Sequence, residues 1–239
     1  MRRTFLFASG VFLGCAWTVP LRCAAQGLPR FGAEVTVSTL GIGIQGATAV
    51  TSRSNVRAGF NAFNYSTDFS KDGINYASEL SLRSFEVLYD QYLFGGFHIS
   101  PGLMAYNGNR GTATASVPGG QSFSLGGASY VSSAVSPVAG TGVLDTRKVE
   151  PMVLIGVGNL LPRNMRHFTV NVEGGVVFQG APKAVLNLHG TACVGAVCQD
   201  VASTQAIQAN VQAEQTKINN SVNFFQYYPV ISVGFGYKF

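Results

Sequence analysis

The C-terminal segment of the chain alternates strictly between large apolar residues and small or polar ones. The apolar positions are Ile231, Val233, Phe235, Tyr237 and Phe239, and the positions between them hold Ser232, Gly234, Gly236 and Lys238. Side chains of a β-strand point alternately to its two faces, so this pattern predicts a strand with one apolar face. That face must be buried, either in a protein core or in a membrane.

Six segments upstream repeat the alternation. Their apolar faces are Leu40, Ile42 and Ile44; Val56, Ala58 and Phe60; Leu80 and Leu82; Phe97, Ile99 and Leu103; Val153, Ile155 and Val157; and Phe168, Val170, Val172, Val176 and Phe178. A weaker strand at 183–189 brings the count to eight, the smallest common number for an outer-membrane barrel, and ten also fits. The alternation slips between Val37 and Leu40 and between Leu82 and Phe85, which a β-bulge or a strand leaving the bilayer would explain.

The first 25 residues have the features of a secretory signal peptide. Residues 1–3 carry positive charge, 5–21 are largely apolar, and 23–25 supply small residues for cleavage. The apolar stretch is too short, and too often interrupted by Gly and Pro, for a transmembrane anchor. We therefore predict a signal peptide at 1–25 and one exported domain at 26–239.

Composition favours a membrane protein over a soluble one. An alternating apolar face also suits a secreted β-sandwich, where it would point into the core. However, only 11% of the residues are charged, against roughly a quarter in soluble proteins, and the chain ends on an aromatic residue. In hydrocarbon every backbone N–H and C=O needs a partner, so strands can cross a membrane only as a closed barrel. The predicted fold class is all-β, a closed antiparallel transmembrane β-barrel in the bacterial outer membrane.

Charge gives no support for nucleic-acid binding. The chain has 16 Lys and Arg and 11 Asp and Glu, but Arg2, Arg3 and Arg22 lie in the predicted signal peptide, which leaves 13 bases against 11 acids. A balance this close to neutral does not predict a polyanionic partner.

The connections between the predicted strands differ in length. The segment 107–148 is rich in Gly, Ser, Thr and Ala and predicts a long loop, whereas 91–96 and 160–166 are short, as periplasmic turns usually are. With both termini periplasmic, the eight strands counted above would put the short turns outside and the long loop inside. The count therefore contains one missed or one superfluous strand.

One segment, 201–220, lacks strand character. It is rich in Gln and Ala, and Ile207, Val211 and Ile218 approximate a helical stripe, so we predict a short amphipathic helix. This helix could plug the lumen, lie on the membrane surface, or lie solvated within a loop.

The terminal segment 228–239 resembles the last strand of bacterial outer-membrane proteins, which ends in Phe after alternating apolar positions. The segments TLGIG at 39–43, LYDQYLFGGF at 88–97 and FQGAPK at 178–183 resemble small outer-membrane barrels of the OmpA/OmpW type. The resemblance implies contact with outer-membrane lipids, with periplasmic chaperones and with the barrel-assembly machinery during biogenesis. It also implies an assembly-signal role for Ile231, Val233, Phe235, Tyr237 and Phe239.

Two cysteines, Cys193 and Cys198, lie outside the predicted signal peptide. Their spacing would let them close a small loop in an oxidising compartment, or they could remain free thiols. Together with His189 they do not complete the four ligands of a zinc site, so no metal and no cofactor are predicted.

Charged residues recur on the small and polar strand faces. We expect them in the lumen, where they could pair and close a narrow barrel or gate a small pore. They are Arg57, Glu79, Arg83, Glu86, Glu173 and Lys238. Because side chains nearly fill a barrel of about eight strands, the packed and paired arrangement is favoured.

The strongest catalytic candidate is the pair His98 and Ser100, which share one face of a predicted strand. It resembles the His-x-Ser of outer-membrane lipid A deacylases, although the following 101–102 departs from that motif. We predict no enzyme. The expected role is structural or in interaction, the alternative is a narrow porin-like channel for small solutes, and a lipid hydrolase using His98 and Ser100 is less favoured.

Overall fold

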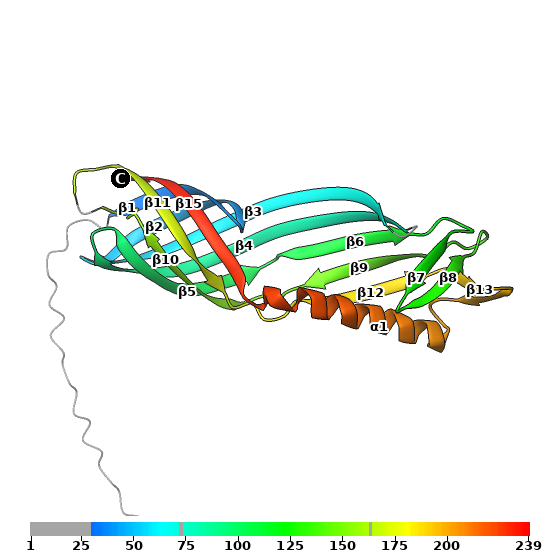
Figure 1. The fold of residues 1–239 in the computed structure, drawn as a ribbon. Coiled ribbons are helices and arrows are strands. Elements are labelled where there is room, and N and C mark those ends of the chain that lie inside the picture. Colours follow the sequence, from blue (N-terminus) through cyan, green and yellow to red (C-terminus); the bar gives the residue numbers. More distant parts are fainter. Residues whose placement is uncertain (1–29, 72–73, 163) are drawn as a thin grey trace, which may run out of the picture.

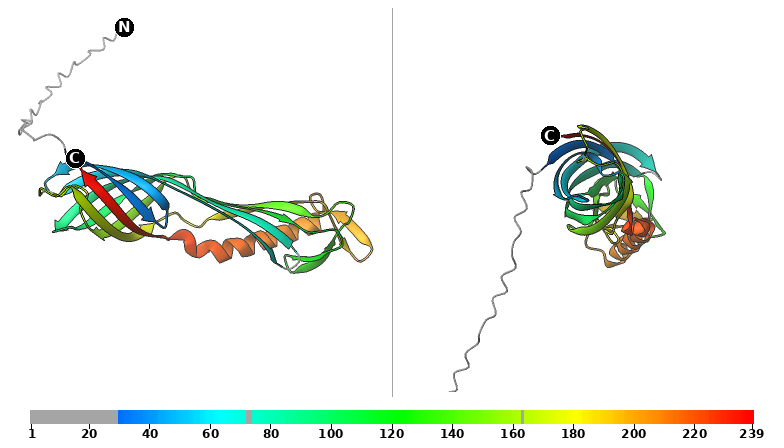
Figure 2. Two further views of the ribbon diagram at one scale, coloured as in Figure 1. Left: turned by 90° about the horizontal axis from the view of Figure 1, so that it is seen from above. Right: turned by 90° about the vertical axis from the view of Figure 1, so that its left-hand side faces the viewer.

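Eight antiparallel strands of the described residues close into a barrel (Figures 1 and 2). The computed structural model describes residues 30–71, 74–162 and 164–239, so the predicted signal peptide at 1–25 lies outside the described residues. The barrel strands are β1 (Phe31–Ser38), β2 (Gly41–Thr51), β3 (Ser54–Lys71), β4 (Ile74–Phe94), β5 (Phe97–Asn107), β10 (Glu150–Val157), β11 (Phe168–Val177) and β15 (Tyr228–Lys238). They neighbour one another in this order, and β15 pairs with β1 to close the ring.

One strand of the sequence-based count was wrong. The strand missed is β1, where Glu34 and Thr36 are buried and Val35 and Val37 are exposed. The segment 183–189 does form a strand, but it lies outside the ring. The slip between Val37 and Leu40 is the tight turn from β1 to β2.

Adding β1 removes the conflict in loop lengths. The short connections β2–β3, β4–β5 and β10–β11 now lie at the end of the barrel that carries both described termini, and the long ones lie at the opposite end (Figure 1). We call these the proximal and the distal end. This is the usual asymmetry of outer-membrane barrels.

The outside of the barrel is apolar. All five alternating residues of the C-terminal segment, from Ile231 to Phe239, are exposed, and Ser232, Gly234, Gly236 and Lys238 face the lumen. A closed barrel with an apolar outside and a polar inside is the arrangement that hydrocarbon requires. The structure thus confirms the predicted fold class.

The strands β3 and β4 continue far beyond the barrel. They contain 18 and 21 residues, whereas about 9–11 residues suffice to cross a membrane. Their distal parts form a curved sheet in the order β3-β4-β6-β9-β12, with β6 (Arg110–Ser116), β9 (Ala139–Asp145) and β12 (Lys183–His189). We call everything beyond the barrel, including this sheet, the extension (Figures 1 and 2).

The far tip of the extension has its own small core. A second sheet has the order β14-β13-β8-β7, formed by β7 (Ser122–Leu125), β8 (Ala128–Ser132), β13 (Thr191–Val194) and β14 (Val197–Asp200). A disulfide joins Cys193 to Cys198 across the β13–β14 hairpin. At the end of β14, hydrogen bonds from the hydroxyl and backbone N–H of Ser203 lower the pKa of the Asp200 carboxyl.

The predicted helix is α1 (Gln205–Val222), followed by the short η1 (Asn223–Gln226) that leads into β15. It lies against the extension, so it is neither a lumen plug nor a membrane-surface helix (Figure 1). Side-chain oxygens of Gln215 and Asn219 accept hydrogen bonds from the backbone N–H groups of Leu186 and Ala184 in β12. The helix therefore protects a free sheet edge. Within the described ranges, no helix combines the length and hydropathy needed to cross a membrane.

The two faces of β3 and β4 exchange polarity where the strands leave the barrel. Inside the barrel the inward pair is Asn61 and Ser84, and alternation places Phe63 and Leu82 next on the same strand faces. The pairing of β3 with β4 continues here without a register shift, and in the pairing with β5 the shift at Phe85 and Glu86 places the extra residue on β5, between Met104 and Tyr106. The inward positions of β4 therefore stay in phase from Leu82 to Glu86, and the slip in the sequence coincides with the point where the strand leaves the barrel.

Candidate functional site in the barrel lumen

An arginine lies at the centre of the lumen. Arg57 projects inward from β3 and is only 2% exposed. Its two terminal nitrogens bind Glu173 in a bidentate pair, at 2.9 Å from Nη1 to Oε2 and 2.5 Å from Nη2 to Oε1. Nη1 also donates to Glu34 and Nη2 to Asp90, each at 3.2 Å. One guanidinium therefore ties four strands together, β1, β3, β4 and β11.

Neutral and ring side chains complete the hydrogen bonding of these carboxylates. Asn171 donates to Glu34 at 2.6 Å, Ser100 donates to Asp90 at 2.7 Å, and His98 Nε2 lies 2.8 Å from Glu173 Oε1. Charges removed from water are tolerated only when they are paired and hydrogen-bonded, and this network supplies such partners. We call Arg57, Glu34, Asp90, Glu173 and His98 the lumen cluster.

An apolar layer lies between the lumen cluster and the distal mouth. It is formed by seven inward side chains that are each at most 3% exposed. They are Leu40, Leu88, Met104, Met152, Leu154, Val177 and Val230. Together these side chains form one buried apolar cluster inside the barrel.

A loop packs across the proximal end. Leu160 and Leu161, between β10 and β11, are buried against Ala47. Lys238 Nζ donates to the backbone oxygens of Pro162, at 3.0 Å, and Asn164, at 2.5 Å. The lumen thus contains three successive groups of buried side chains, at the proximal loop, the cluster and the apolar layer.

The predicted lumen charges fall into three groups. Arg57, Glu86 and Glu173 are buried inside the barrel, and Glu86 accepts a hydrogen bond from Gln45 at 2.8 Å. Lys238 also faces inward, but it binds loop carbonyls instead of an acid.

Glu79 and Arg83 do not lie in the lumen, and for them the prediction was wrong. Both are exposed on the outward face of β4, and Arg83 lies beside Ala62 on β3. The alternation of Leu80 and Leu82 predicted an outward apolar face, as in the barrel, but both residues lie beyond the polarity exchange, where the apolar face points inward.

Two members of the lumen cluster, Glu34 and Asp90, were missed. Glu34 belongs to the overlooked β1, although Val35 and Val37 on either side of Thr36 carry the alternation. The inward position of Asp90 could have been predicted, because Phe85, Val87 and Tyr89 point outward and the residues that alternate with them point inward.

The structure does not join His98 and Ser100 into a catalytic pair. His98 Nδ1 lies 3.0 Å from the Gly96 carbonyl and Nε2 faces Glu173, so both ring nitrogens are engaged away from Ser100. Ser100 donates to Asp90 and is fully buried. A nucleophile needs its base within hydrogen-bonding reach and access to substrate, and neither condition is met.

No metal site emerges in the described residues, where no group of three or more His, Cys, Asp or Glu could hold an ion. The two cysteines near His189 are bonded to each other.

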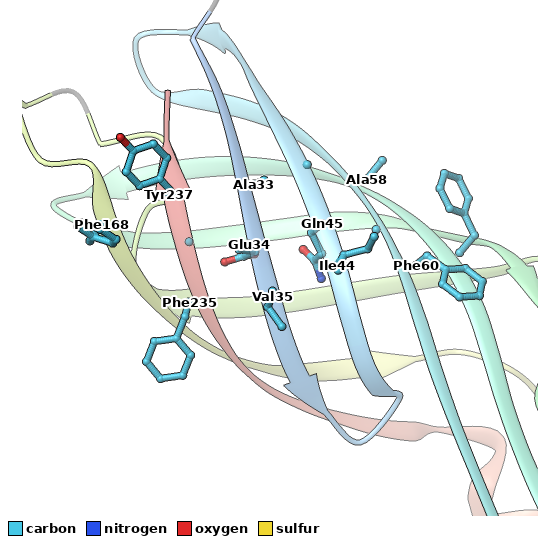
Figure 3. A pocket seen from close by; sticks show the side chains of 14 residues that line it. Ala33, Glu34, Val35, Ile44, Gln45, Ala58, Phe60, Phe168, Phe235 and Tyr237 are labelled. Carbon is cyan, nitrogen blue, oxygen red and sulfur yellow. The ribbon is translucent and has the colours of Figure 1, made fainter.

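The outer surface of the barrel carries a depression near its proximal end (Figure 3). Its floor is a row of small residues on three neighbouring strands, Ala33, Gly46 and Ala58. Aromatic side chains stand around it, among them Phe60 and Phe235 (Figure 3). The depression interrupts an apolar surface, and Glu34 and Gln45, the polar residues that border it, occupy buried inward positions.

The comparisons with known proteins identify a fold. No protein-family model and no curated protein match the chain. Two solved structures of Acinetobacter baumannii are similar, CarO and CarO2. CarO has 21% identity and a TM-score of 0.54, and the match covers 86% of this chain and 96% of CarO. CarO2 has 19% identity and a TM-score of 0.55, with 90% and 100% covered. The chain has the fold of an outer-membrane β-barrel, and this fold together with its apolar outside indicates the bacterial outer membrane as its location.

Proposed function

We propose that this protein is an integral outer-membrane barrel with a closed lumen, and that it has a structural or interaction role exercised through the extension. The observation that carries the proposal is the buried lumen cluster around Arg57. The barrel holds the extension at the membrane, and the extension, which points away from the termini, lies on the extracellular side.

Energetics support a permanently packed lumen. Removing one partner from a buried ion network typically costs about 3–5 kcal/mol, because the remaining charge is left uncompensated. A conducting state would have to separate Arg57 from three carboxylates and also displace the apolar layer. A small barrel has little room for such a change, since side chains nearly fill its interior.

The surroundings of the barrel follow from its outer face. We propose outer-membrane lipids as its contacts, with acyl chains filling the depression floored by Ala33, Gly46 and Ala58. Assembly by the barrel-assembly machinery, after transport by periplasmic chaperones, is proposed from the exposed row that ends at Phe239. A place among small barrels of the OmpA/OmpW type also remains a proposal, supported by the small ring and the short proximal turns.

Current across a planar bilayer tests the closed lumen. The folded protein, verified by its heat-dependent migration on a detergent gel, is expected to give no steady current. The variants Arg57→Met and Arg83→Met remove a positive charge inside the lumen and outside the barrel, respectively. A steady wild-type current that changes in Arg57→Met but not in Arg83→Met would establish the narrow channel instead and overturn the proposal.

A further inference from the structure

The inward face of the extension is an apolar surface built in regular rows. Strand pairing aligns Tyr65, Leu80, Gly111, Leu144 and Ala184 across β3, β4, β6, β9 and β12. The next row comprises Thr67, Ser78, Ala113, Gly142 and Leu186, and the third comprises Phe69, Tyr76, Ala115, Gly140 and Leu188. Across the three rows the strands β6 and β9 contribute Gly or Ala at every position except Leu144.

These small residues form the floor of a groove. Larger side chains of β3 and β4 rise on one side, and Leu186 and Leu188 of β12 with Ile218 and Val222 of α1 rise on the other. The groove has a volume of about 370 Å³ and is open on one side, and a smaller cavity of about 150 Å³ continues toward the tip. Small-molecule sites typically measure about 300–1,000 Å³, so the groove has the size of a ligand site.

The backbone does not require all the glycines of the floor. A Cβ placed on Gly111 would meet nothing closer than the Leu144 Cβ at 3.5 Å, which is an ordinary contact. At Gly140, by contrast, a Cβ would lie 2.2 Å from Leu188 Cδ2 and clash. Protein interiors are normally filled to close packing, and glycine within a strand often marks the close approach of another molecule. The space above Gly111 is therefore left open where a side chain would fit.

The groove is separate from the membrane. The opposite face of the same sheet is polar, with Asn64, Ser66 and Asp68 exposed on β3, so the extension stands in water. The three rows contain no charged residue, and the charged residues near the two cavities are Glu79, which alternation directs to the other face, and Glu214 on α1. Hydroxyl groups of Thr67, Ser78 and tyrosines supply the polarity. A lining of this kind favours an uncharged ligand.

We propose that this groove binds a neutral, largely apolar small molecule from the external medium. The inference deepens the interaction role proposed above and rests on it, but it does not depend on whether the lumen conducts. Tyr65 and Tyr76 provide ring surfaces for such a ligand, and the glycine and alanine floor lets it approach the backbone of β6 and β9.

Fluorescence titration with the neutral probe N-phenyl-1-naphthylamine tests the proposal. The full mature chain is placed in lipid nanodiscs, and empty nanodiscs give the background from lipid. A saturable component is expected, and Gly111→Leu or Ala113→Leu should weaken it about tenfold because leucine occupies the floor. The control Thr114→Leu adds bulk on the opposite, exposed face of the same strand and should leave binding unchanged.

Three results would overturn the proposal. They are the absence of saturable binding above the lipid background, unchanged binding in both groove variants, and equal loss in Thr114→Leu. Limited proteolysis of each variant verifies that the extension is folded. Gly111→Leu and Ala113→Leu change different rows of the floor, so each tests the groove separately. Current in the bilayer experiment would contradict only the closed lumen, whereas a non-conducting protein without probe binding would contradict only the groove.

Discussion

The barrel and the extension are built on the same two strands, yet they present opposite faces to their surroundings. In β3, alternation puts Phe60 on the outward face within the barrel and Phe63 on the inward face beyond it. The pairing with β4 does not shift between the two residues. The backbone is continuous, and only the surrounding medium differs. In both regions the apolar face of the strands points away from water, which means outward in the barrel and inward in the extension.

The two regions consequently use different means to hold themselves together. The barrel pairs polar groups around Arg57 in its interior, because its apolar residues lie on the outer surface. The extension buries residues such as Ile207 and Val211 under the sheets, as a soluble protein does. The same kind of substitution should therefore change stability differently in the barrel and in the extension.

The largest effect is expected from Arg57→Met. The substitution leaves Glu34, Asp90 and Glu173 buried without their common cation, which should lower the free energy of unfolding by about 3–5 kcal/mol. Urea unfolding of the protein in micelles measures this. The same substitution at the exposed Arg83 should change stability by less than about 0.5 kcal/mol, and similar losses at both sites would mean that the cluster is not a buried network.

A charge on the outward face should be costly only in the barrel. Val172→Arg, near the middle of β11, should lower stability by about 2–4 kcal/mol, because the guanidinium must enter the hydrocarbon. Ser66→Arg lies on the outward face of the extension opposite Glu79 and should be tolerated. Urea unfolding in lipid vesicles compares the two, and equal tolerance would show that the barrel surface does not face lipid.

The smallest effect concerns the tip. Replacing Cys193 and Cys198 by serine removes the link that closes a short loop, worth about 2 kcal/mol by loop-closure entropy. Amide hydrogen exchange should increase in β13 and β14 while the barrel strands keep their protection. Faster exchange in the barrel as well would show that the two regions unfold as one unit.

Much of the fold could be predicted because each barrel strand carries its own two-residue period. Seven of the eight barrel strands were visible in this way, and α1 was visible from its approximate helical stripe. Strand β1 was lost because the tight turn before Leu40 broke the alternation, and the segment 183–189 was counted in its place. Local patterns reveal that a strand exists, but not which sheet it joins, since its partners lie far away in the sequence.

The lumen cluster shows the same limit. Arg57, Glu86 and Glu173 were expected inside the barrel. Their sequence neighbours are apolar and face outward, so alternation turns these three side chains inward. Glu79 and Arg83 were misplaced because the sequence does not state where β4 leaves the membrane. Beyond that point the outward face of the strand is polar and the inward face is apolar. The bidentate pairing of Arg57 with Glu173 joins residues 116 positions apart and is invisible in any local pattern.

By itself, the sequence determined that this protein is an all-β chain of alternating strands, with an outward row ending at Phe239 and one helix near the C-terminus. Local side-chain alternation suffices for this, because it reports which face of each strand is apolar. Only the tertiary structure decided that β1 closes the ring, that the lumen is packed around Arg57, and that β3 and β4 exchange their faces to form the groove. These features depend on which strands meet and on where the hydrocarbon ends, and both are set by contacts between distant parts of the chain.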